Sequence, residues 1–550
     1  MVGAGPAGSA AALSLARKGV NVLMLEKSRV PGERSMTGGV LYGDSPGGWG
    51  LIHLVPGFEA TAPLERKITS HEVVVLDAPD PAKGTARYYR LTKDSVPARA
   101  RLFSMGFETG HDYSVLRRRF DRWFAAQAVQ AGAMLSTETT AEGLTIEGGA
   151  VVGVRTPRED LRAKLVIDAS GVTSNLVAEA GLRGRLTPRE LYHGIKRVYR
   201  LDAGAIEQRF KVKPGEGKAV FYLGRFMNDI SGGAFVYTNR DTLSVGMVVS
   251  LGSLIRRTTE HFDQVGKLLD VQDAFEAHPM VAELLDGAQA VEYAAHNIPK
   301  GHRAMLKRPY ADGFLVAGDA LGSFVKIGPM IDGMRRAVSS GMMAASAYML
   351  AAPSGSFRGK ELSRYRDLLR PIYEDVGRSG RDSLVTESSF TYHTLPGLLF
   401  STRVMSKVYK FEPRAAPGAH RDAIARVQEG TGLLAYDEDE AYSHIAVDTA
   451  LASKSLTKPW VPACPTNCYT IFTPKGVFAS FKDLYEHNLA QNGGDGRGAM
   501  SEALADIGAA ELRFDHVPCV ACGTCGAIGP TEMVKFGHER DGHGVRYKFG

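Results

Sequence analysis

The sequence has 550 residues, of which 44% are hydrophobic and 23% are charged. This length predicts about two to four domains, and the composition excludes an intrinsically disordered chain. The net charge of +6 fits either a mildly basic surface or attraction to anionic lipid or to an acidic protein partner, and we expect no nucleic-acid partner.

No apolar stretch is long enough for a membrane-spanning helix, because the longest, 342–352, is short and contains Ser346 and Tyr348. The chain opens directly into a motif, so we expect no signal or transit peptide. These two features together predict a cytoplasmic prokaryotic protein.

A glycine-rich motif opens the chain, with Gly3, Gly5 and Gly8 at the G-x-G-x-x-G spacing. A helical apolar stretch follows, and then a strand that ends at Glu26. In such a unit the glycines allow a tight turn, close approach of the pyrophosphate and close helix packing, while the acid accepts hydrogen bonds from a ribose. The motif therefore predicts a dinucleotide site. Only two residues precede Gly3, so either other residues complete the first strand or the protein begins upstream of Met1.

Three further segments favour FAD over NAD. Residues 113–121 lead into a predicted helix, and 165–171 form an apolar strand that ends in small residues. A third strand ends at Asp319, which can bind the ribityl hydroxyls. The helix that opens at 331–334 could stabilise negative charge on a reduced flavin.

The segment 117–121 and the pair Gly318–Asp319 resemble the flavoprotein superfamily of aromatic hydroxylases and geranylgeranyl reductases. Within it, the sequence most resembles the FixC flavoproteins, which are related to electron-transfer-flavoprotein:ubiquinone oxidoreductase. The stretches that carry this resemblance are 38–43, 62–68, 114–123 and 237–244.

The resemblance implies FAD contacts along much of the first 350 residues. For Arg117 the alternative is an exposed helix cation beside Arg118 and Arg119. The implied FAD-binding residues are Gly3, Ala4, Gly5, Pro6, Ala7, Gly8, Glu26, Lys27, Gly38, Gly39, Arg117, Gly318, Asp319, Gly333 and Met334.

The five cysteines are confined to the C-terminal region, since the first 463 residues contain none. This confinement predicts one local function and not a disulfide framework. Residues 519–530 follow the ferredoxin pattern C-x-x-C-x-x-C-x-x-x-C-P, except that Gly529 replaces the fourth cysteine. Cys464 precedes a proline and can supply the missing thiolate, although Cys468 is an alternative. The predicted ligands of one [4Fe-4S] cluster are Cys464, Cys519, Cys522 and Cys525.

A structural zinc site is the alternative for these cysteines, but zinc ribbons usually pair two separate C-x-x-C knuckles. The region also resembles FixX, the ferredoxin-like partner of FixC, through Cys464–Pro465 with Tyr469, the run 519–525 and the tail 542–550. Residues 471–511 resemble an insertion. Fusion of the two modules is the organisation of the ubiquinone oxidoreductase family.

The predicted fold is α/β, or α+β over the whole chain. It combines a Rossmann-like FAD-binding domain of the glutathione-reductase/hydroxylase type, a mixed-sheet substrate (quinone) domain and a ferredoxin-like 4Fe-4S domain. The predicted ranges are 1–171 with 300–355 for FAD, 172–299 for the substrate, 356–455 for a helical segment and linker, and 456–550 for the cluster.

The predicted function is an oxidoreductase that passes electrons from the reduced two-subunit electron-transfer flavoprotein, through the cluster and FAD, to ubiquinone or menaquinone. Such a protein could also belong to a FixCX-type electron-bifurcating complex. Because the cofactors carry the chemistry, we expect no catalytic nucleophile or base, and we interpret His193 and His393 as structural. The alternatives are a prenyl-lipid reductase and a non-catalytic electron relay.

We expect peripheral attachment to the cytoplasmic face of the cell membrane, with the mitochondrial inner membrane as the alternative. The best candidate for a membrane contact is the apolar segment 394–400, followed by Arg403, Lys407 and Lys410. A second candidate is 49–56. The alternative for the first segment is a core helix with a basic solvated face.

Overall fold

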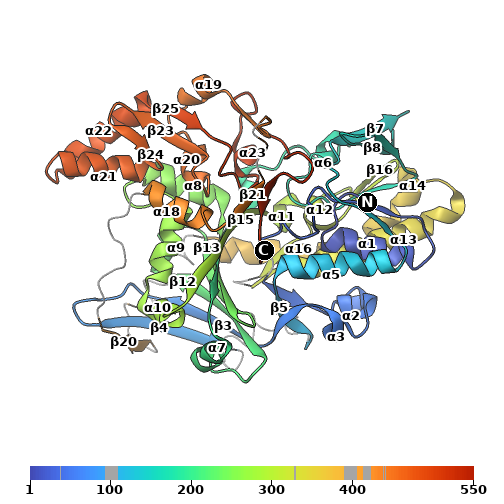
Figure 1. Ribbon diagram of the computed structural model, residues 1–550, viewed down its shortest axis with the longest axis horizontal. Helices are drawn as coiled ribbons and strands as arrows, with labels where there is room; N and C mark the ends of the chain where they lie inside the picture. The colour runs from blue at the N-terminus through green and yellow to red at the C-terminus, as the bar shows by residue number, and fades with distance from the viewer. Residues whose placement is uncertain are drawn as a thin grey trace.

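Three regions lie side by side in the computed structural model: a nucleotide-binding region, a large sheet with its helices, and a C-terminal region (Figure 1). The structure describes residues 1–36, 39–92, 110–327, 330–388, 400, 406–412, 423–437, 439 and 441–550.

The nucleotide-binding region contains a parallel sheet in which Val2 bridges Leu25 on one side and Asp168 on the other. The short first strand is therefore this one bridging residue. Pro6 occupies the first turn of α1, where its missing N–H leaves no donor unpaired. The elements are β6 (Met134–Ser136), β1 (Leu23–Leu25), β10 (Val166–Asp168), β17 (Phe314–Val316), β16 (Tyr310–Ala311), α1 (Pro6–Ala16), α5 (Arg117–Gln130), α12 (Gly318–Leu321) and α13 (Met334–Ala351).

Helix α1 packs tightly between α13 and the turn at Gly3 that precedes α1. A Cβ atom at Gly8 would clash with the carbonyl oxygen of Gly3, and one at Gly341 would clash with that of Ala7. These two glycines let α1 lie close to both neighbours, as the sequence predicts for Gly8.

The large sheet has ten strands in the described chain and is mixed, because β12 and β3 pair in parallel while its other pairs are antiparallel. Its main order is β15 (Gln289–Pro299), β11 (Leu191–Arg200), β14 (Thr242–Ser250), β13 (Gly232–Thr238), β12 (Glu216–Gly224), β3 (Leu64–Leu76), β4 (Thr85–Thr92) and β20 (Lys407–Lys410), with β5 (Asp112–Val115) on β3 and β2 (Val40–Tyr42) on β5.

The sheet draws on more of the chain than the predicted substrate domain 172–299. Four strands, β2 to β5, come from the range 1–171 that the sequence assigns to FAD binding. The chain leaves the nucleotide-binding region to supply them and returns through α5. The two regions are thus interleaved along the chain.

The range 356–455, predicted as a helical segment and linker, also contains an edge strand. Residues Lys407–Lys410 form β20 and pair with β4. Their alternation of Lys, Val, Tyr and Lys has the two-residue period of a strand. The later part of this range contains further ordered elements, namely α18 (Ala423–Thr431), β21 (Ala435–Asp437), β22 (Ile445–Val447) and α19 (Thr449–Ser453).

The C-terminal region is a small layered unit. Residues 471–511, which resemble an insertion in the sequence, form much of it. Strands β21 and β22 pair with β27 and β26, so the preceding segment is part of this unit. Its other elements are α20 (Trp460–Ala463), β23 (Tyr469–Thr473), β24 (Gly476–Phe478), α21 (Phe481–Gln491), α22 (Gly496–Ala509), β25 (Glu511–Phe514), α23 (Thr524–Ile528), β26 (Val534–Phe536) and β27 (Gly544–Arg546).

Within the part of the chain that the structure describes, no helix combines the length and apolar character needed to cross a bilayer.

The remaining elements are α2 (Leu51–Leu54), α3 (Phe58–Thr61), β7 (Gly143–Glu147), β8 (Ala150–Arg155), β9 (Asp160–Arg162), α6 (Leu176–Glu179), α7 (Ala203–Phe210), α8 (Leu251–Glu260), α9 (Leu268–Glu276), α10 (Pro279–Leu285), α11 (Gly301–Ala304), β18 (Val325–Ile327), β19 (Met330–Asp332), α14 (Gly359–Leu362), α15 (Arg364–Leu368) and α16 (Arg370–Thr386).

Most of the first predicted membrane segment, 394–399, and Arg403 lie outside the described residues. Phe400 is buried, and its ring centroid lies 5.1 Å from that of Tyr89. In the second candidate, 49–56, Leu51 and Leu54 are buried in the core of the nucleotide-binding region.

Candidate functional site

One large cavity opens between the nucleotide-binding sheet, the large sheet and the C-terminal region. Of the predicted FAD-binding residues, Ala4 and Gly8 do not line it, and Gly38 lies outside the described residues. The predicted residues that do line it are Gly3, Gly5, Pro6, Ala7, Glu26, Lys27, Gly39, Arg117, Gly318, Asp319, Gly333 and Met334.

The cradle at the start of α1 has the geometry that the motif predicts. Gly3 has a φ of +93°, which favours glycine. A Cβ atom at Gly5 would have no heavy atom within 4 Å, because Gly5 faces open cavity space. The Glu26 carboxylate accepts N–H bonds from Ala4 (3.1 Å) and Ser28 (2.9 Å), which fix its orientation. The helix N-terminus and this carboxylate together fit a pyrophosphate and a ribose.

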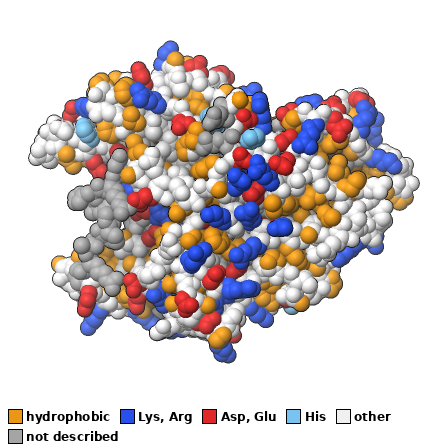
Figure 2. All heavy atoms as spheres, in the orientation of Figure 1, with side chains coloured by type: hydrophobic (Ala, Val, Ile, Leu, Met, Phe, Trp, Pro, Cys, Tyr) orange, Lys and Arg blue, Asp and Glu red, His pale blue; other side chains and the backbone are white. Residues whose placement is uncertain are grey.

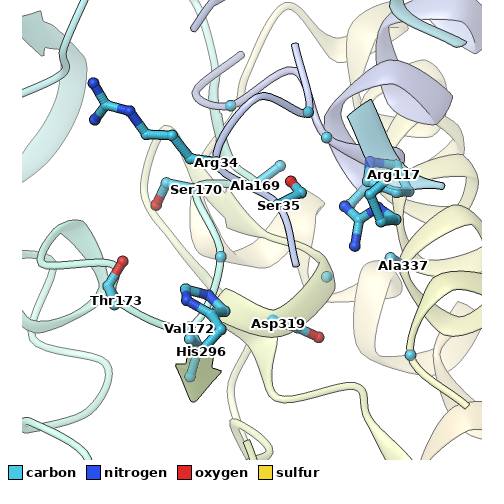
Figure 3. Close-up of a pocket in the computed structure, with 18 of the residues that line it drawn as sticks. Arg34, Ser35, Arg117, Ala169, Ser170, Val172, Thr173, His296, Asp319 and Ala337 are labelled. Carbon is cyan, nitrogen blue, oxygen red and sulfur yellow. The ribbon is translucent and has the colours of Figure 1, made fainter. Parts of the chain in front are cut away.

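Arg117 and Asp319 form the charged part of the cavity wall. Figure 3 shows Arg117 and Ala337 on one side, Val172, Thr173 and His296 on the other, and Asp319 between them. The Arg117 guanidinium donates to both oxygens of Asp121, at 2.9 and 2.7 Å. Burial raises the pKa of Asp319 to about 6, and Arg117 opposes that shift. Arg117 is therefore not the exposed helix cation of the alternative interpretation.

The C-terminal region supplies wall residues that the sequence did not indicate. Ala521 and His538 line the cavity. The neighbouring Glu539 is buried and accepts from Lys27 (3.3 Å) and Arg34 (3.1 Å), and these two cations hold the pKa of its carboxyl well below the ordinary value despite burial. The ion pairs fasten the C-terminal region to the nucleotide-binding region at the edge of the cavity.

All five cysteines line a second, smaller cavity in the C-terminal region. The Thr466 hydroxyl lies between the sulfurs of Cys464 (3.4 Å) and Cys468 (3.2 Å). The Ala521 N–H donates to the Cys519 sulfur at 3.3 Å. Cys464 and Cys468 are thus equally placed to reach the cavity, so the geometry does not separate the preferred ligand from its alternative.

Residues 1–275 match the family model of FAD-dependent oxidoreductases. The chain belongs to this family. Protein FixC of Escherichia coli K12 is 35% identical over 422 residues, which cover 77% of this chain and 89% of FixC. The probable electron transfer flavoprotein-quinone oxidoreductase YgcN of the same organism is 38% identical over 352 residues, 64% of this chain and 76% of YgcN. The resemblance to FixC proteins is therefore confirmed.

A solved structure shares the fold of this FAD-dependent oxidoreductase. It is a geranylgeranyl bacteriochlorophyll reductase-like protein from Thermoplasma acidophilum, with a TM-score of 0.54 at 22% identity. The match covers 78% of this chain and 97% of that protein. The predicted α/β flavoprotein fold with a mixed second sheet is thus confirmed. Because the large cavity contains the predicted dinucleotide cradle, we call it the FAD cavity.

The loop that carries Cys519, Cys522 and Cys525 contributes residues to both the FAD cavity and the cysteine cavity. Ala521 lines the first and Cys522 lines the second. Ala521 has a φ of +50°, and Gly523 has one of +79°. Such left-handed backbone is strained for alanine and clusters at functional sites. These two residues bend the chain so that it presents one residue to each cavity.

The histidine interpreted as structural lies beside this segment. His193 is fully buried, and burial lowers its pKa to about 4, so the imidazole is neutral. Its Nδ1 atom lies 2.9 Å from the Asn297 side-chain oxygen and 3.1 Å from the Thr524 hydroxyl. The Cys522 sulfur donates to that hydroxyl at 3.3 Å. His193 therefore supports the cysteine loop, as a structural role predicts; His393 lies outside the described residues.

Proposed function

We propose that this chain passes electrons from a reduced electron-transfer flavoprotein, through one [4Fe-4S] cluster and FAD, to a membrane quinone. The observation that carries the proposal is the shared wall of the two cavities. A cluster at the cysteines and an FAD in its cavity would be separated by little more than the segment 521–523.

The cysteine set fits a cluster better than a single ion. A cubane binds one thiolate at each of four corners, so its ligands surround a volume. The three sulfurs of 519–525, with that of Cys464 or Cys468, surround one cavity in this way.

When bound, an iron–sulfur cluster carries single electrons, and FAD can accept them singly and release a pair. The chain's own residues orient and shield these groups. The start of α1 and Arg117 balance the charge of the pyrophosphate, while buried Val520 and Ala521 exclude water between the two cavities. No proton-transfer residue is needed between the cavities, because electrons alone cross that wall.

The large sheet presents the Tyr237 ring to the FAD cavity, supported from behind by two buried aromatic rings. Tyr237 lines the FAD cavity and stacks on Phe235, with 4.5 Å between ring centroids and 15° between planes. Phe221 meets the Tyr237 ring edge-on at 5.8 Å. Aromatic walls of this kind suit a quinone ring.

Peripheral membrane binding is supported by the end of α16. Leu384 and Val385 are 78% and 61% exposed there, which is unusual for two adjacent large apolar side chains. They precede the segment 394–400 that the sequence favours as a membrane contact. This face could dip into one leaflet and admit a quinone tail.

A basic surface supports an acidic protein partner. Figure 2 shows Lys and Arg side chains gathered across the middle of one face. Helix α5 carries exposed Arg119 and Arg122. Opposite charge would speed the encounter with the electron donor and make it sensitive to salt.

The test measures quinone reduction by the purified protein with reduced electron-transfer flavoprotein, together with its FAD, iron and acid-labile sulfide. We expect about one FAD and four iron atoms per chain. Zinc without sulfide would end the cluster assignment. Reduction of a prenyl double bond, or electron transfer only to another protein, would favour the prenyl reductase or the relay.

The membrane part of the proposal needs its own variants. Leu384→Glu with Val385→Glu should abolish liposome binding and quinone reduction, yet leave reduction of a soluble dye intact. Leu456→Glu is the matched control, because Leu456 is 75% exposed but lies in the C-terminal region. Equal liposome binding by the double variant and the control would exclude α16 as the membrane contact.

A further inference from the structure

A buried lysine from the large-sheet region reaches into the loop that carries Cys464. Lys267 directly precedes α9 and is 3% exposed. Its ammonium donates to the carbonyl oxygens of Val461 (2.7 Å), Cys464 (3.1 Å) and Thr466 (3.2 Å). All three ammonium hydrogens therefore bond to carbonyl oxygens of one short segment, 461–466, in the C-terminal region.

The three carbonyls satisfy the hydrogen bonds of Lys267 but do not neutralise its charge. Among the described residues, no carboxylate lies within 4 Å of its ammonium. The acids that act on it are Asp483 and Asp270, and Asp270 is already paired with Arg426 at 3.1 Å. A buried charge without a counter-charge costs free energy. We therefore expect another group to supply negative charge beside the Lys267 ammonium.

The cysteine cavity is the place where negative charge would appear. The Lys267 ammonium bonds the carbonyl oxygen of Cys464 at 3.1 Å, and Cys464 and Cys468 both line that cavity. Two other basic side chains lie near the thiols from further around the cavity, His444 near Cys519 and exposed Arg185 near Cys525. Of the three, Lys267 is the most deeply buried.

We propose that Lys267 is a positioning residue for the iron–sulfur cluster, and that its charge raises the cluster's midpoint potential. The inference rests on the proposed function, since it requires a cluster at the cysteines. A cubane with four thiolates is an anion, and reduction adds one more negative charge. A fixed positive charge beside it stabilises the reduced form, and net charge and hydrogen bonding set the potentials of such clusters.

Lys458 provides a matched control in the same region. It is also fully buried, and its ammonium donates to the carbonyl oxygens of Ser455 (3.1 Å) and Ile507 (2.8 Å). Only burial shifts its pKa, and no cysteine contributes. Replacing Lys458 removes an equally buried ammonium without removing charge beside the thiols.

The experiment is an EPR-monitored redox titration of the purified holoprotein as wild type, Lys267→Gln, Lys267→Arg and Lys458→Met. Glutamine keeps donors but loses the charge, whereas arginine keeps the charge. We expect Lys267→Gln to make cluster reduction about tenfold less favourable, which is a shift of about 59 mV to lower potential. Lys267→Arg and Lys458→Met should keep the wild-type potential.

The outcomes separate this inference from the proposed function. A wild-type protein without iron and sulfide would overturn both. A wild-type cluster whose potential is unchanged in Lys267→Gln would overturn only the role of Lys267. If Lys267→Gln fails to hold a cluster while Lys267→Arg holds one, the requirement for charge is supported. Loss of the cluster in both variants would mean that packing, and not charge, explains the buried lysine.

Discussion

The main-chain N–H of Asn297 donates a hydrogen bond of 3.2 Å to the main-chain carbonyl of Cys522. The residue that precedes each of them in the sequence lines the FAD cavity. These two residues are His296 on β15 and Ala521 on the cysteine loop. This bond joins the last strand of the large sheet to the C-terminal region. A main-chain contact therefore ties the cysteine loop directly to the strand β15 beside the FAD cavity.

Ala521 should tolerate glycine but not a larger residue. Ala521→Gly removes a left-handed alanine and should stabilise the protein by about 1 kcal/mol with unchanged FAD content. Ala521→Val should lose most FAD, because a β-branched residue resists φ of +50° and its methyl groups would enter the cavity. Flavin absorbance and thermal unfolding measure both effects. Full FAD retention by Ala521→Val would contradict the assignment of this wall.

The choice between Cys464 and Cys468 can be decided by single substitutions. Cys464→Ser should lose the cluster and keep FAD, because Cys464 precedes a proline as in ferredoxins. Cys468→Ser should keep both. Iron, sulfide and flavin analysis of the two variants gives the answer, and Cys522→Ser serves as the positive control for cluster loss. A cluster that survives Cys464→Ser but not Cys468→Ser would show that the ligand prediction is wrong.

Asp319 should destabilise the flavin-free protein at neutral pH. Its folded pKa of about 6 lies above the ordinary value of 3.8, so the folded protein binds this proton more tightly than the unfolded chain does. The penalty is complete above pH 6 and disappears as the pH falls below 3.8. Asp319→Asn should therefore raise the free energy of unfolding at pH 7 by roughly 3 kcal/mol, and the gain should shrink towards pH 4.

The same substitution should weaken FAD retention, because it removes a carboxylate acceptor from the cavity. Urea unfolding of flavin-free protein between pH 4 and pH 8 measures the stability, and FAD titration measures the binding. An Asn variant that is less stable than wild type at pH 7 would contradict the sign of the pKa shift.

Glu292 should hold the end of the chain in place. Its buried carboxylate accepts N–H bonds from Lys548, Phe549 (2.9 Å) and Gly550 (2.9 Å), and the Lys196 ammonium donates to the Gly550 carbonyl. Glu292→Leu leaves these donors unpaired beside a buried cation and should cost on the order of 3 kcal/mol. Limited trypsin digestion should then cleave after Lys548, as measured by mass spectrometry.

Glu260→Leu is the control for that variant, because Glu260 is exposed at the end of α8. It should leave both stability and trypsin resistance unchanged. Equal digestion of the two variants would show that the tail is held by other contacts.

The dinucleotide cradle could be predicted from the sequence because its signals are local. Gly3, Gly5 and Glu26 belong to one short motif, whose spacing dictates the turn, the helix and the second strand. Arg117 and Asp319 are distant in sequence and follow strands of two different sheets, β5 and β17, so no local motif predicts that they meet. The family resemblance supplied their roles.

The contacts between the C-terminal region and the rest of the chain could not be predicted in this way. Ala521, His538 and Lys267 reach their places through docking of one region on another, and no periodicity or motif encodes that docking. Ala521 depends on an unusual φ angle, and Lys267 on carbonyls nearly 200 residues away. The strand β20 was also missed, because a four-residue edge strand gives too little periodic signal to outweigh a helical neighbourhood.

The part of the FAD cavity wall that Ala521 and His538 supply has a consequence for how the protein is made in the cell. A ribosome releases the cradle of Gly3 and Gly5 early and these two residues more than 500 positions later. Until then the cavity lacks this part of its wall, so FAD can meet the cradle before the wall is complete. The C-terminal region then docks through Glu539, which pairs with Lys27 and Arg34 at the edge of the cavity.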